Sequence, residues 1–465
     1  MTPILVWFRR DLRLSDHPAL AAAAATGRPV IALFIRDVET DRPGAASRWW
    51  LHHSLSSLAE SLKAKGSSLV LRSGPSEKVL RDLVRETGAG AVYWSRLYDP
   101  VSIERDTRIK SALKADGVEV ESFNASLLFE PWEMKNKTGR PFQVFTPFWK
   151  ACLAVGREWD VEAAPKKLSA PSKTPKSEEL LSWALLPRIP WDARFRERFE
   201  PGEEGANKAL KQFLRSGVND YADARDVPGI RGTSRLSPHL HFGEISPRQI
   251  VTQVEGRGKG PQTFVKEIGW REFAHHLLFH FPQTLTEPLR PEFKDFPWSK
   301  DTSTLPSWKK GLTGYPIVDA GMRELWTTGW MHNRVRMIVA SFLVKDLRLP
   351  WQTGADWFWD TLVDADPANN TLGWQWAAGC GADAAPYFRV FNPTLQGERF
   401  DPEGTYVREW IPELANLESK WIHRPWEAPD EVRARIRSYP NPIVDHGQAR
   451  DDALAAFKKL KKAPV

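Results

Sequence analysis

One short segment, residues 364–376, gathers side chains that could do redox chemistry. It contains the carboxylates Asp364 and Asp366, the amide Asn370 and the indoles Trp374 and Trp376. Buried carboxylates and amides need hydrogen-bond partners, and an indole brings a large flat surface with a single donor. This mixture is poor material for an ordinary core. It favours a segment that surrounds a polar, planar, redox-active group, and a flavin is the candidate that we infer.

A second set of residues could hold phosphate. Tyr221 and a later polar run supply hydroxyls, backbone N–H groups and a guanidinium, which suit a pyrophosphate near the start of a helix. The run consists of Thr233, Ser234, Arg235, Leu236 and Ser237. It can equally be the N-cap of a helix that begins at Ser237. Both interpretations stay open, because a cap and an anion site use the same free N–H groups.

Two short segments bring polar and apolar residues together within about one helical turn. Glu267 shares a helix face with either Trp270 or Arg271, because these residues lie within little more than one turn. Taken alone, this pattern would be a surface ion pair over an aromatic ring. Asn333 and Met337 are likewise one turn apart in a segment with helical periodicity. Either turn could therefore present polar and apolar groups together.

Short β-rich runs alternate with longer amphipathic runs in the N-terminal part. The β-rich runs are residues 4–8, 30–34, 68–71, 91–94 and 118–123. This rhythm predicts right-handed βαβ units, and so a Rossmann-like α/β domain with a five-stranded parallel sheet and helices on both faces. The first βα turn, residues 8–13, has no glycine. It lacks the nucleotide-binding fingerprint, so the main cofactor should lie elsewhere.

Composition divides the chain into three predicted parts. Residues 1–130 form the Rossmann-like α/β domain. Residues 131–204 form an interdomain linker, whose later part is rich in Pro, Lys, Ser and Glu. Helical periodicity dominates after Gly205, and residues 205–465 are predicted to form an all-α domain.

Charge and cysteine content limit the class of protein. The net charge of +7 and the pI of about 9.2 are compatible with a basic face for a polyanion or with a merely basic surface. Cys152 and Cys380 are far apart in the sequence, which argues against a disulfide framework or a metal centre, so we expect no metal. No signal peptide and no membrane-length apolar run is recognisable, so a cytoplasmic protein without membrane contact is expected.

The chain resembles the photolyase/cryptochrome family over nearly its whole length. Residues 364–376, continued by 379–389 and 391–393, look like the family's flavin-binding signature, and residues 232–237, 270–273 and 329–334 stand in the family's order and spacing. Four matches in register argue strongly against coincidence. The resemblance implies an FAD cofactor in the helical domain. It also implies a light-driven deoxyribodipyrimidine photolyase, a carbon–carbon lyase in which reduced FAD passes an electron to a flipped-out cyclobutane pyrimidine dimer in DNA.

The same resemblance implies roles for individual residues. Trp374, Trp351 and Trp298 would relay electrons to the flavin, Asn370 would face flavin N5, and Glu267 would hydrogen-bond the damaged base. Arg336 is expected to pair with Asp364. The implied cofactor-binding residues are Tyr221, Thr233, Ser234, Arg235, Leu236, Ser237, Arg271, Asn333, Arg336, Asp364, Asp366 and Asn370. The implied substrate-binding residues are Glu267, Trp270, Asn333, Arg334, Met337, Trp376 and Gln396.

The resemblance leaves the subclass to be tested. Residues 96–102 and 126–133 resemble plant cryptochromes, whereas Asn370 and residues 379–381 resemble photolyases. This combination is similar to class III photolyases, which usually carry a 5,10-methenyltetrahydrofolate antenna in the N-terminal domain. A (6-4) photolyase expects histidine where this chain has Met337, and a cryptochrome photoreceptor without repair activity expects an acid at position 370 and a long C-terminal tail. We expect a monomer that acts on double-stranded DNA containing pyrimidine dimers.

Overall fold

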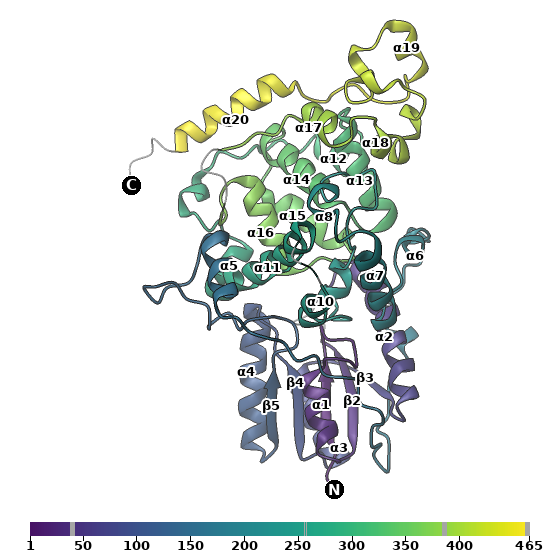
Figure 1. The fold of residues 1–465 in the computed structure, drawn as a ribbon, viewed down its shortest axis with the longest axis vertical. Coiled ribbons are helices and arrows are strands. Elements are labelled where there is room, and N and C mark those ends of the chain that lie inside the picture. The colour runs from purple at the N-terminus through teal and green to yellow at the C-terminus, as the bar shows by residue number, and fades with distance from the viewer. Residues whose placement is uncertain (38–41, 255, 257, 384–387, 461–465) are drawn as a thin grey trace.

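The computed structural model describes residues 1–37, 42–254, 256, 258–383 and 388–460. Residues 384–387, which belong to the expected flavin-binding signature, lie outside the described residues. The α/β part and the helical part stack along the long axis of the molecule, and the C-terminal helix crosses the far end of the helical part (Figure 1).

The N-terminal part is a five-stranded parallel sheet with strand order β3-β2-β1-β4-β5. Its strands are β1 (Ile4–Phe8), β2 (Val30–Arg36), β3 (Leu69–Ser73), β4 (Ala91–Ser95) and β5 (Glu119–Phe123). Neighbouring strands run in parallel, with Val6 opposite Ala32 on β2 and Tyr93 on β4. The predicted α/β fold with a five-stranded parallel sheet is therefore confirmed.

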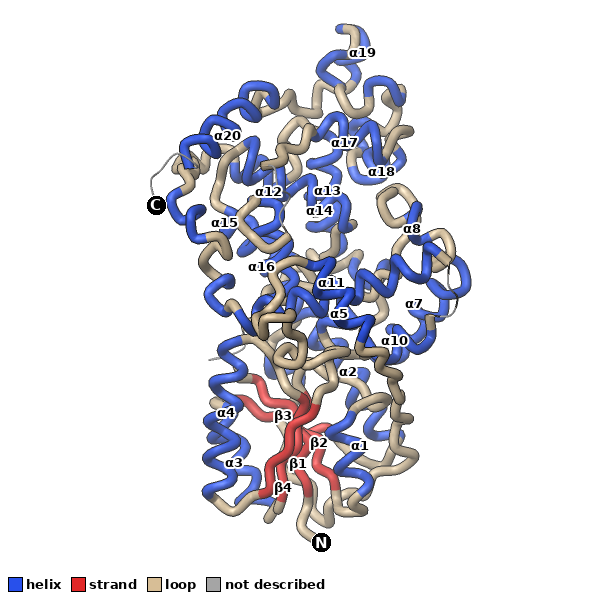
Figure 2. Tube along the Cα trace, turned by 60° about the vertical axis from the view of Figure 1, so that its left-hand side comes forward, coloured by secondary structure: helices blue, strands red, loops and turns tan. Residues whose placement is uncertain are grey.

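Side chains of β1 alternate between the two faces of the sheet, and each face is covered by helices. Ile4, Val6 and Phe8 pack with helices α1 (Pro18–Ala25) and α2 (Ala45–Ala64). Leu5 and Trp7 pack with α3 (Ser76–Thr87) and α4 (Pro100–Ala115) on the opposite face, as Figure 2 shows. This period of two is the pattern of a strand that is buried on both faces.

The rest of the chain is helical. The α-helices are α5 (Phe145–Ala154), α6 (Phe195–Arg198), α7 (Glu203–Ser216), α8 (Tyr221–Ala224), α9 (Ser237–His241), α10 (Pro247–Gln253), α11 (Lys259–His280), α12 (Leu305–Lys310), α13 (Pro316–Thr328), α14 (Asn333–Ser341), α15 (Trp351–Thr361), α16 (Pro367–Ala378), α17 (Pro393–Phe400), α18 (Thr405–Trp410), α19 (Asp430–Arg435) and α20 (His446–Leu460). Short 3₁₀ turns are η1 (Leu180–Trp183), η2 (Pro282–Leu285), η3 (Pro291–Asp295), η5 (Pro412–Leu414), η6 (Ser419–Trp421) and η7 (Pro425–Glu427), and η4 (Phe342–Asp346) is a π-helical turn that continues α14. No helix in the described part of the chain is long and apolar enough to cross a membrane.

Two hydrophobic clusters build the helical part around its central helices. One joins α12 to α16 with the C-terminal helices and includes Trp351 and Trp374. The other joins α7 to α11 and includes Phe145 and Phe148 of α5. Helix α5 lies inside the range predicted as a linker, yet it is packed against α11. The predicted linker therefore contributes to the core of the helical part.

Candidate functional site

Helix α16 carries several of the predicted site residues, and its two ends are firmly defined. Asp366 is the N-cap, and its carboxylate accepts hydrogen bonds from the backbone N–H of Asn369 at 2.8 Å and from its side-chain amide at 2.7 Å. Pro367 occupies the first turn, and Gly379 ends the helix at φ 86°, a left-handed conformation that favours glycine. These caps fix where Asn370, Trp374 and Trp376 lie along the helix.

Two histidines flank the Asp366 carboxylate. His241 Nδ1 lies 3.9 Å and His275 Nε2 lies 3.7 Å from Asp366 Oδ2. Burial alone would raise the pKa of Asp366, but His275, His241 and the guanidinium of Arg271 hold that pKa well below its usual value. Asp366 is therefore an ionised carboxylate, and because burial lowers the pKa of His275 to about 4, the permanent positive charge near it is the guanidinium of Arg271.

Arg336 pairs with Asp364, as predicted. Its Nη2 donates to Asp364 Oδ2 at 2.8 Å, and its Nε donates to the carbonyl oxygen of Met331 at 2.7 Å. The guanidiniums of Arg235 and Arg336 lie 5.4 Å and 5.9 Å from the ring centroid of Trp330. Two permanently charged guanidiniums thus lie close to the indole of Trp330.

The run expected to hold phosphate forms the loop that leads into α9. Arg235 adopts φ 53°, an unusual conformation for a residue other than glycine and one that tightly folded functional loops often hold. Ser237 begins α9, as predicted, and its hydroxyl accepts a hydrogen bond from Trp330 Nε1 at 3.3 Å. Tyr221 is buried at the start of α8, between the rings of Phe213 and Phe264. The hydrogen bond between Trp330 and Ser237 joins this loop to the segment that carries Trp330.

The three tryptophans expected to relay electrons share one hydrophobic cluster. Trp374 and Trp351 are each 2 % exposed, and Trp298 packs at the border of the cluster. The ring of Trp374 meets Phe358 edge-on at 4.9 Å and Trp308 at 6.3 Å. A Cβ at position 354 would overlap the Trp374 indole, so Gly354 is the residue that allows this indole to pack against α15.

A series of ion pairs connects Glu267 to Arg334, which are two of the predicted substrate-binding residues. Arg225 pairs with Glu267, and Arg225 Nε also lies 3.8 Å from Asp226 Oδ1. Asp226 Oδ1 in turn lies 2.9 Å from Arg334 Nη2. Glu267 and Arg334, which lie on different helices, are therefore joined through a pair of residues that directly follows α8.

Arg334 also connects α14 to the predicted substrate-binding residue on α17. Its guanidinium lies 4.4 Å from the ring centroid of Phe400, and its Nη1 lies 3.8 Å from the sulfur of Met337. Gln396 is one helical turn before Phe400 on α17, so the two side chains share a face. The structure thus brings Arg334, Met337 and Gln396 into one neighbourhood.

Two indoles expected to form walls of a substrate cavity are each held by an aromatic neighbour. The ring of Trp270 stacks on Phe145, with centroids 3.7 Å apart and an interplanar angle of 8°. Trp376 meets Phe391 edge-on at 6.3 Å. Both indoles are only partly buried, so each keeps surface that a ligand can contact.

The remaining predicted residues are less closely integrated. Asn333 is exposed at the start of α14. Arg271 donates to the carbonyl oxygen of Ser126 at 2.6 Å, so one of its N–H groups ties the α/β part to α11. Asn370 donates its side-chain N–H to the carbonyl oxygen of Ala355 at 3.1 Å. Its other amide atom, Oδ1, is an acceptor.

The donor and acceptor set fits FAD. Buried polar atoms without a hydrogen-bond partner occur in several places in the described part of the chain, and they include Arg235 Nε, His332 Nε2, Asp364 Oδ1 and Trp374 Nε1 at or next to predicted site residues. Buried polar atoms in native proteins almost always have a hydrogen-bond partner. Unpartnered atoms at residues that are expected to form one site therefore support the presence of a polar ligand there. These donors and this acceptor suit phosphate oxygens and the N–H and carbonyl groups of a flavin ring.

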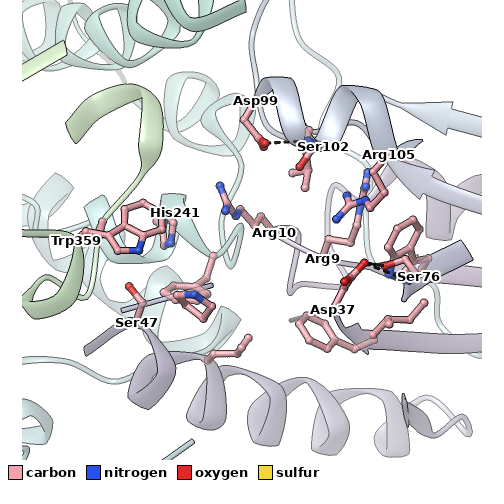
Figure 3. Close-up of a pocket in the computed structure, with 18 residues that line it drawn as sticks. Arg9, Arg10, Asp37, Ser47, Ser76, Asp99, Ser102, Arg105, His241 and Trp359 are labelled. Carbon is pink, nitrogen blue, oxygen red and sulfur yellow. Dashed lines mark hydrogen bonds between the residues drawn. The ribbon is translucent and has the colours of Figure 1, made fainter. Parts of the chain in front are cut away.

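A separate cavity lies where the α/β part meets the helical part. Aromatic rings and guanidiniums line it together: Figure 3 shows Arg9 and Arg105 on one side, His241 and Trp359 on the other, and Arg10 between them. The cavity opens at the carboxyl ends of β1, β2 and β4. Because the strand order reverses between β1 and β4, this edge is the topological switch point at which parallel sheets bind ligands. His241 borders this cavity and also flanks Asp366.

Sequence reasoning did not identify several of these neighbours. Arg225 and Asp226 could have been noticed as a charged pair about one helical turn after Tyr221, and His241 as one of two histidines that closely follow Ser237. His275 and Phe145 offered no comparable signal, because each is brought to the site by packing between helices that are distant in the sequence. Among the described residues, no group of three or more His, Cys, Asp or Glu could hold a metal ion.

Comparisons with known proteins agree with this geometry. Residues 264–459 match the family model described as "FAD binding domain of DNA photolyase", and residues 4–172 match the one described as "DNA photolyase". This match confirms the expectation of FAD as cofactor. Helices α14 and α16 and most of α11 fall within the first of these matches.

Individual relatives cover almost the whole chain. The deoxyribodipyrimidine photo-lyase of Agrobacterium fabrum is 50% identical over 99% of this chain and 98% of its own. Cryptochrome-1 of Arabidopsis thaliana is 43% identical over 99% of this chain and 71% of its own. The crystal structure of a bacterial class III photolyase from Agrobacterium tumefaciens superposes with a TM-score of 0.97 and 49% identity, and covers 100% of this chain and 98% of its own. The chain therefore belongs to the photolyase/cryptochrome family.

Proposed function

We propose that this chain is a deoxyribodipyrimidine photo-lyase that repairs cyclobutane pyrimidine dimers in DNA. The observation that carries the proposal is the amide at position 370. Asn370 binds Ala355 through its N–H and so presents an acceptor oxygen, where a photoreceptor of the family expects an acid. The half-identical photo-lyase relative and the class III photolyase structure support the same assignment.

FAD, when bound and reduced, supplies an electron donor that blue light excites. The residues of this chain hold its polar groups and its charge. The guanidinium of Arg336, fixed by Asp364, would provide positive charge for an anionic ring. Arg235 and the loop before α9 supply donors for phosphate. Asp366, whose pKa lies well below its usual value, would accept hydrogen bonds from polar groups of the cofactor.

The substrate would lie between Trp270 and Trp376. A dimer is poorly stacked in duplex DNA, which lowers the free energy of flipping it into such a cavity. Glu267, held by Arg225, would accept hydrogen bonds from the base, and Arg334 would contact backbone phosphate. Lys and Arg contacts to phosphate make the affinity salt-dependent. We expect the protein to act as a monomer on double-stranded DNA in the cytoplasm.

A blue-light photoreceptor without repair activity is the second candidate. The identity to a plant cryptochrome over nearly the whole chain is the observation that favours it. A (6-4) photolyase is less well supported, because Met337 stands where that subclass expects histidine.

One experiment separates these functions. Purified FAD-loaded protein, chemically reduced, is illuminated with blue light in the presence of an oligonucleotide that contains a single thymine dimer, and restored thymines are quantified. A cyclobutane-dimer photo-lyase restores them in the light and not in the dark. The same assay is run with a matching oligonucleotide that contains a (6-4) lesion. Repair of neither lesion would favour the photoreceptor, and repair of the (6-4) lesion alone would identify the other subclass.

The cavity between the two parts of the molecule is where we place an antenna chromophore, with 5,10-methenyltetrahydrofolate as the candidate. Its rings, which include Trp7, Phe34, Phe242 and Trp359, suit a planar heterocycle. The guanidiniums around it suit glutamyl carboxylates. Mass spectrometry of the small molecules released from purified protein tests this placement. Trp359→Ala should lower the folate content and leave the FAD content unchanged, whereas equal loss of both would contradict it.

A further inference from the structure

Among the described residues of the helical part, Phe145 and Trp270 form the ring stack with the shortest centroid separation, 3.7 Å at an interplanar angle of 8°. Phe145 is the first residue of α5 and is 1 % exposed, whereas Trp270 on α11 is only partly buried. Phe145 therefore lies on the protein side of the indole. One face of Trp270 is covered, and the surface that remains accessible belongs to the edge and the other face.

Two further contacts restrict the orientation of this pair. Phe273, which is fully buried, meets Trp270 at 6.0 Å and Phe145 at 5.8 Å, nearly edge-on in both cases. Trp149, one turn after Phe145 on α5, lies almost parallel to it at 11°. A Cβ at Gly269 would stand 2.6 Å from the Trp149 indole. A glycine inside α11 is unfavourable for helix stability, and here it lets α5 approach α11 closely enough for the stack to form.

We propose that Phe145 is a positioning residue for lesion recognition. Its ring holds the indole of Trp270 at the angle at which the uncovered face can stack on a flipped-out pyrimidine dimer. This inference rests on the proposed function, because it assigns Phe145 to the same cavity. Phe145 acts through Trp270 and does not itself touch the substrate.

The proposal predicts a selective loss of affinity. An indole without its backing ring gains rotational freedom, which binding of the dimer must then remove. Undamaged DNA binds through phosphate contacts that do not involve Trp270, so its affinity should not change. Loss of one stacked ring pair corresponds to roughly a 2- to 10-fold weaker binding of the dimer.

The test uses Phe145→Leu, which keeps an apolar side chain and removes the flat ring. FAD-loaded protein is titrated in the dark with a duplex that contains one thymine dimer and with the same duplex undamaged. The ratio of the two affinities should fall by the stated factor. In repair assays KM for dimer-containing DNA should rise while kcat stays at the wild-type value, because the flavin site is untouched. Phe145→Met provides a second variant of the same kind if Phe145→Leu does not load FAD.

Phe148→Leu is the matched control. Phe148 lies on the same helix and is equally buried, but its ring contacts are with Phe142, Phe273 and His276. It should change stability without changing the affinity ratio. The proposal is overturned if Phe148→Leu lowers the ratio as much as Phe145→Leu does, or if Phe145→Leu keeps the wild-type ratio.

A double-mutant cycle gives an independent readout. In a Trp270→Ala background, Phe145→Leu should have no further effect on the ratio, because its effect passes through the indole. A full additional loss in that background would show that Phe145 acts in another way. If the wild-type protein itself fails to distinguish damaged from undamaged DNA, the proposed function fails, and that outcome is distinct from failure of this inference.

Discussion

The side-chain amide of Asn370 donates a hydrogen bond to the backbone carbonyl oxygen of Ala355 at 3.1 Å, across the interface of α16 and α15. This bond occupies the N–H side of the amide and leaves Oδ1 as an acceptor. An ionised carboxylate at position 370 could not make it, and Ala355 would lose its side-chain donor. A carboxyl group there could replace the bond only by keeping its proton.

Asn370→Asp should therefore change the light-induced state of bound FAD. If residue 370 faces flavin N5, as the resemblance implies, a protonated carboxyl there would donate a proton at N5, which the amide cannot. We expect illuminated mutant protein to gain long-wavelength absorption that the wild type lacks, and its repair yield to fall. Asn370→Ala is the comparison, since it removes the amide without adding an acid. A mutant with the wild-type spectrum and full repair would remove Asn370 from the neighbourhood of N5.

Trp374→Phe should block photoreduction of oxidised FAD and spare repair by protein that has been reduced chemically. The indole is buried against Phe358 and Trp308, and phenylalanine fills most of its volume but gives up an electron far less readily. Photoreduction is followed by the loss of oxidised-flavin absorbance under blue light.

Trp410→Phe is the control for that experiment. Trp410 belongs to the same hydrophobic cluster and is also buried, but the groups over its ring are the guanidiniums of Arg194 and Arg198. It should photoreduce at the wild-type rate. If Trp374→Phe does so as well, the relay role of Trp374 is wrong, and Trp351 and Trp298 lose their support with it.

Much of the α/β part could be predicted because its information is local. Most strands are short, largely apolar runs bounded by helical periodicity, and β1 was predicted with its observed limits. The observed β2 extends to Arg36, past the predicted end at residue 34. Helix α5 was not foreseen, because residues 145–154 are stabilised by packing Phe145 and Phe148 against α11 rather than by strong intrinsic helix propensity.

The site residues also divide into those that the sequence predicts and those that only tertiary packing brings together. The Arg336–Asp364 pair followed from the resemblance, and the relation between Asp366, Asn370 and Trp374 follows from helical spacing. The pairing of Glu267 with Arg225 and the stacking of Trp270 on Phe145 depend on how α11 packs against α8 and α5. A single sequence carries no direct signal for such tertiary partners.

Arg334→Ala should weaken binding to damaged and undamaged DNA by the same factor. If Arg334 contacts one phosphate, the slope of log affinity against log salt concentration should decrease by about one unit. Binding is measured by titration over a range of salt concentrations. Asp226→Asn is the control, because it releases Arg334 from its ion pair at 2.9 Å and should leave the slope unchanged. A loss confined to dimer-containing DNA would place Arg334 in the lesion cavity instead.

Glu324 should make stability depend on pH with a predictable sign. Burial raises the pKa of its carboxyl from 4.5 to about 7, although the Tyr406 hydroxyl and the backbone N–H of His332 oppose that shift. The folded protein thus binds this proton more tightly than the unfolded chain does. The stabilising effect is complete below the unfolded pKa and is lost as pH rises through about 7.

Glu324→Gln isolates this effect, because an amide does not titrate and its oxygen can still accept from Tyr406 at a site where the carboxylate accepts at 2.7 Å. The stability of the variant relative to wild type should increase between about pH 5 and pH 8 by no more than about 3 kcal/mol. Thermal unfolding of both proteins across this range checks it, and taking the difference cancels other buried groups such as Glu272, whose pKa burial also raises to about 7. His332, with a pKa lowered to about 4 by burial, stays neutral throughout. A difference that does not vary with pH would mean that Glu324 keeps an ordinary pKa despite its burial beside Tyr406.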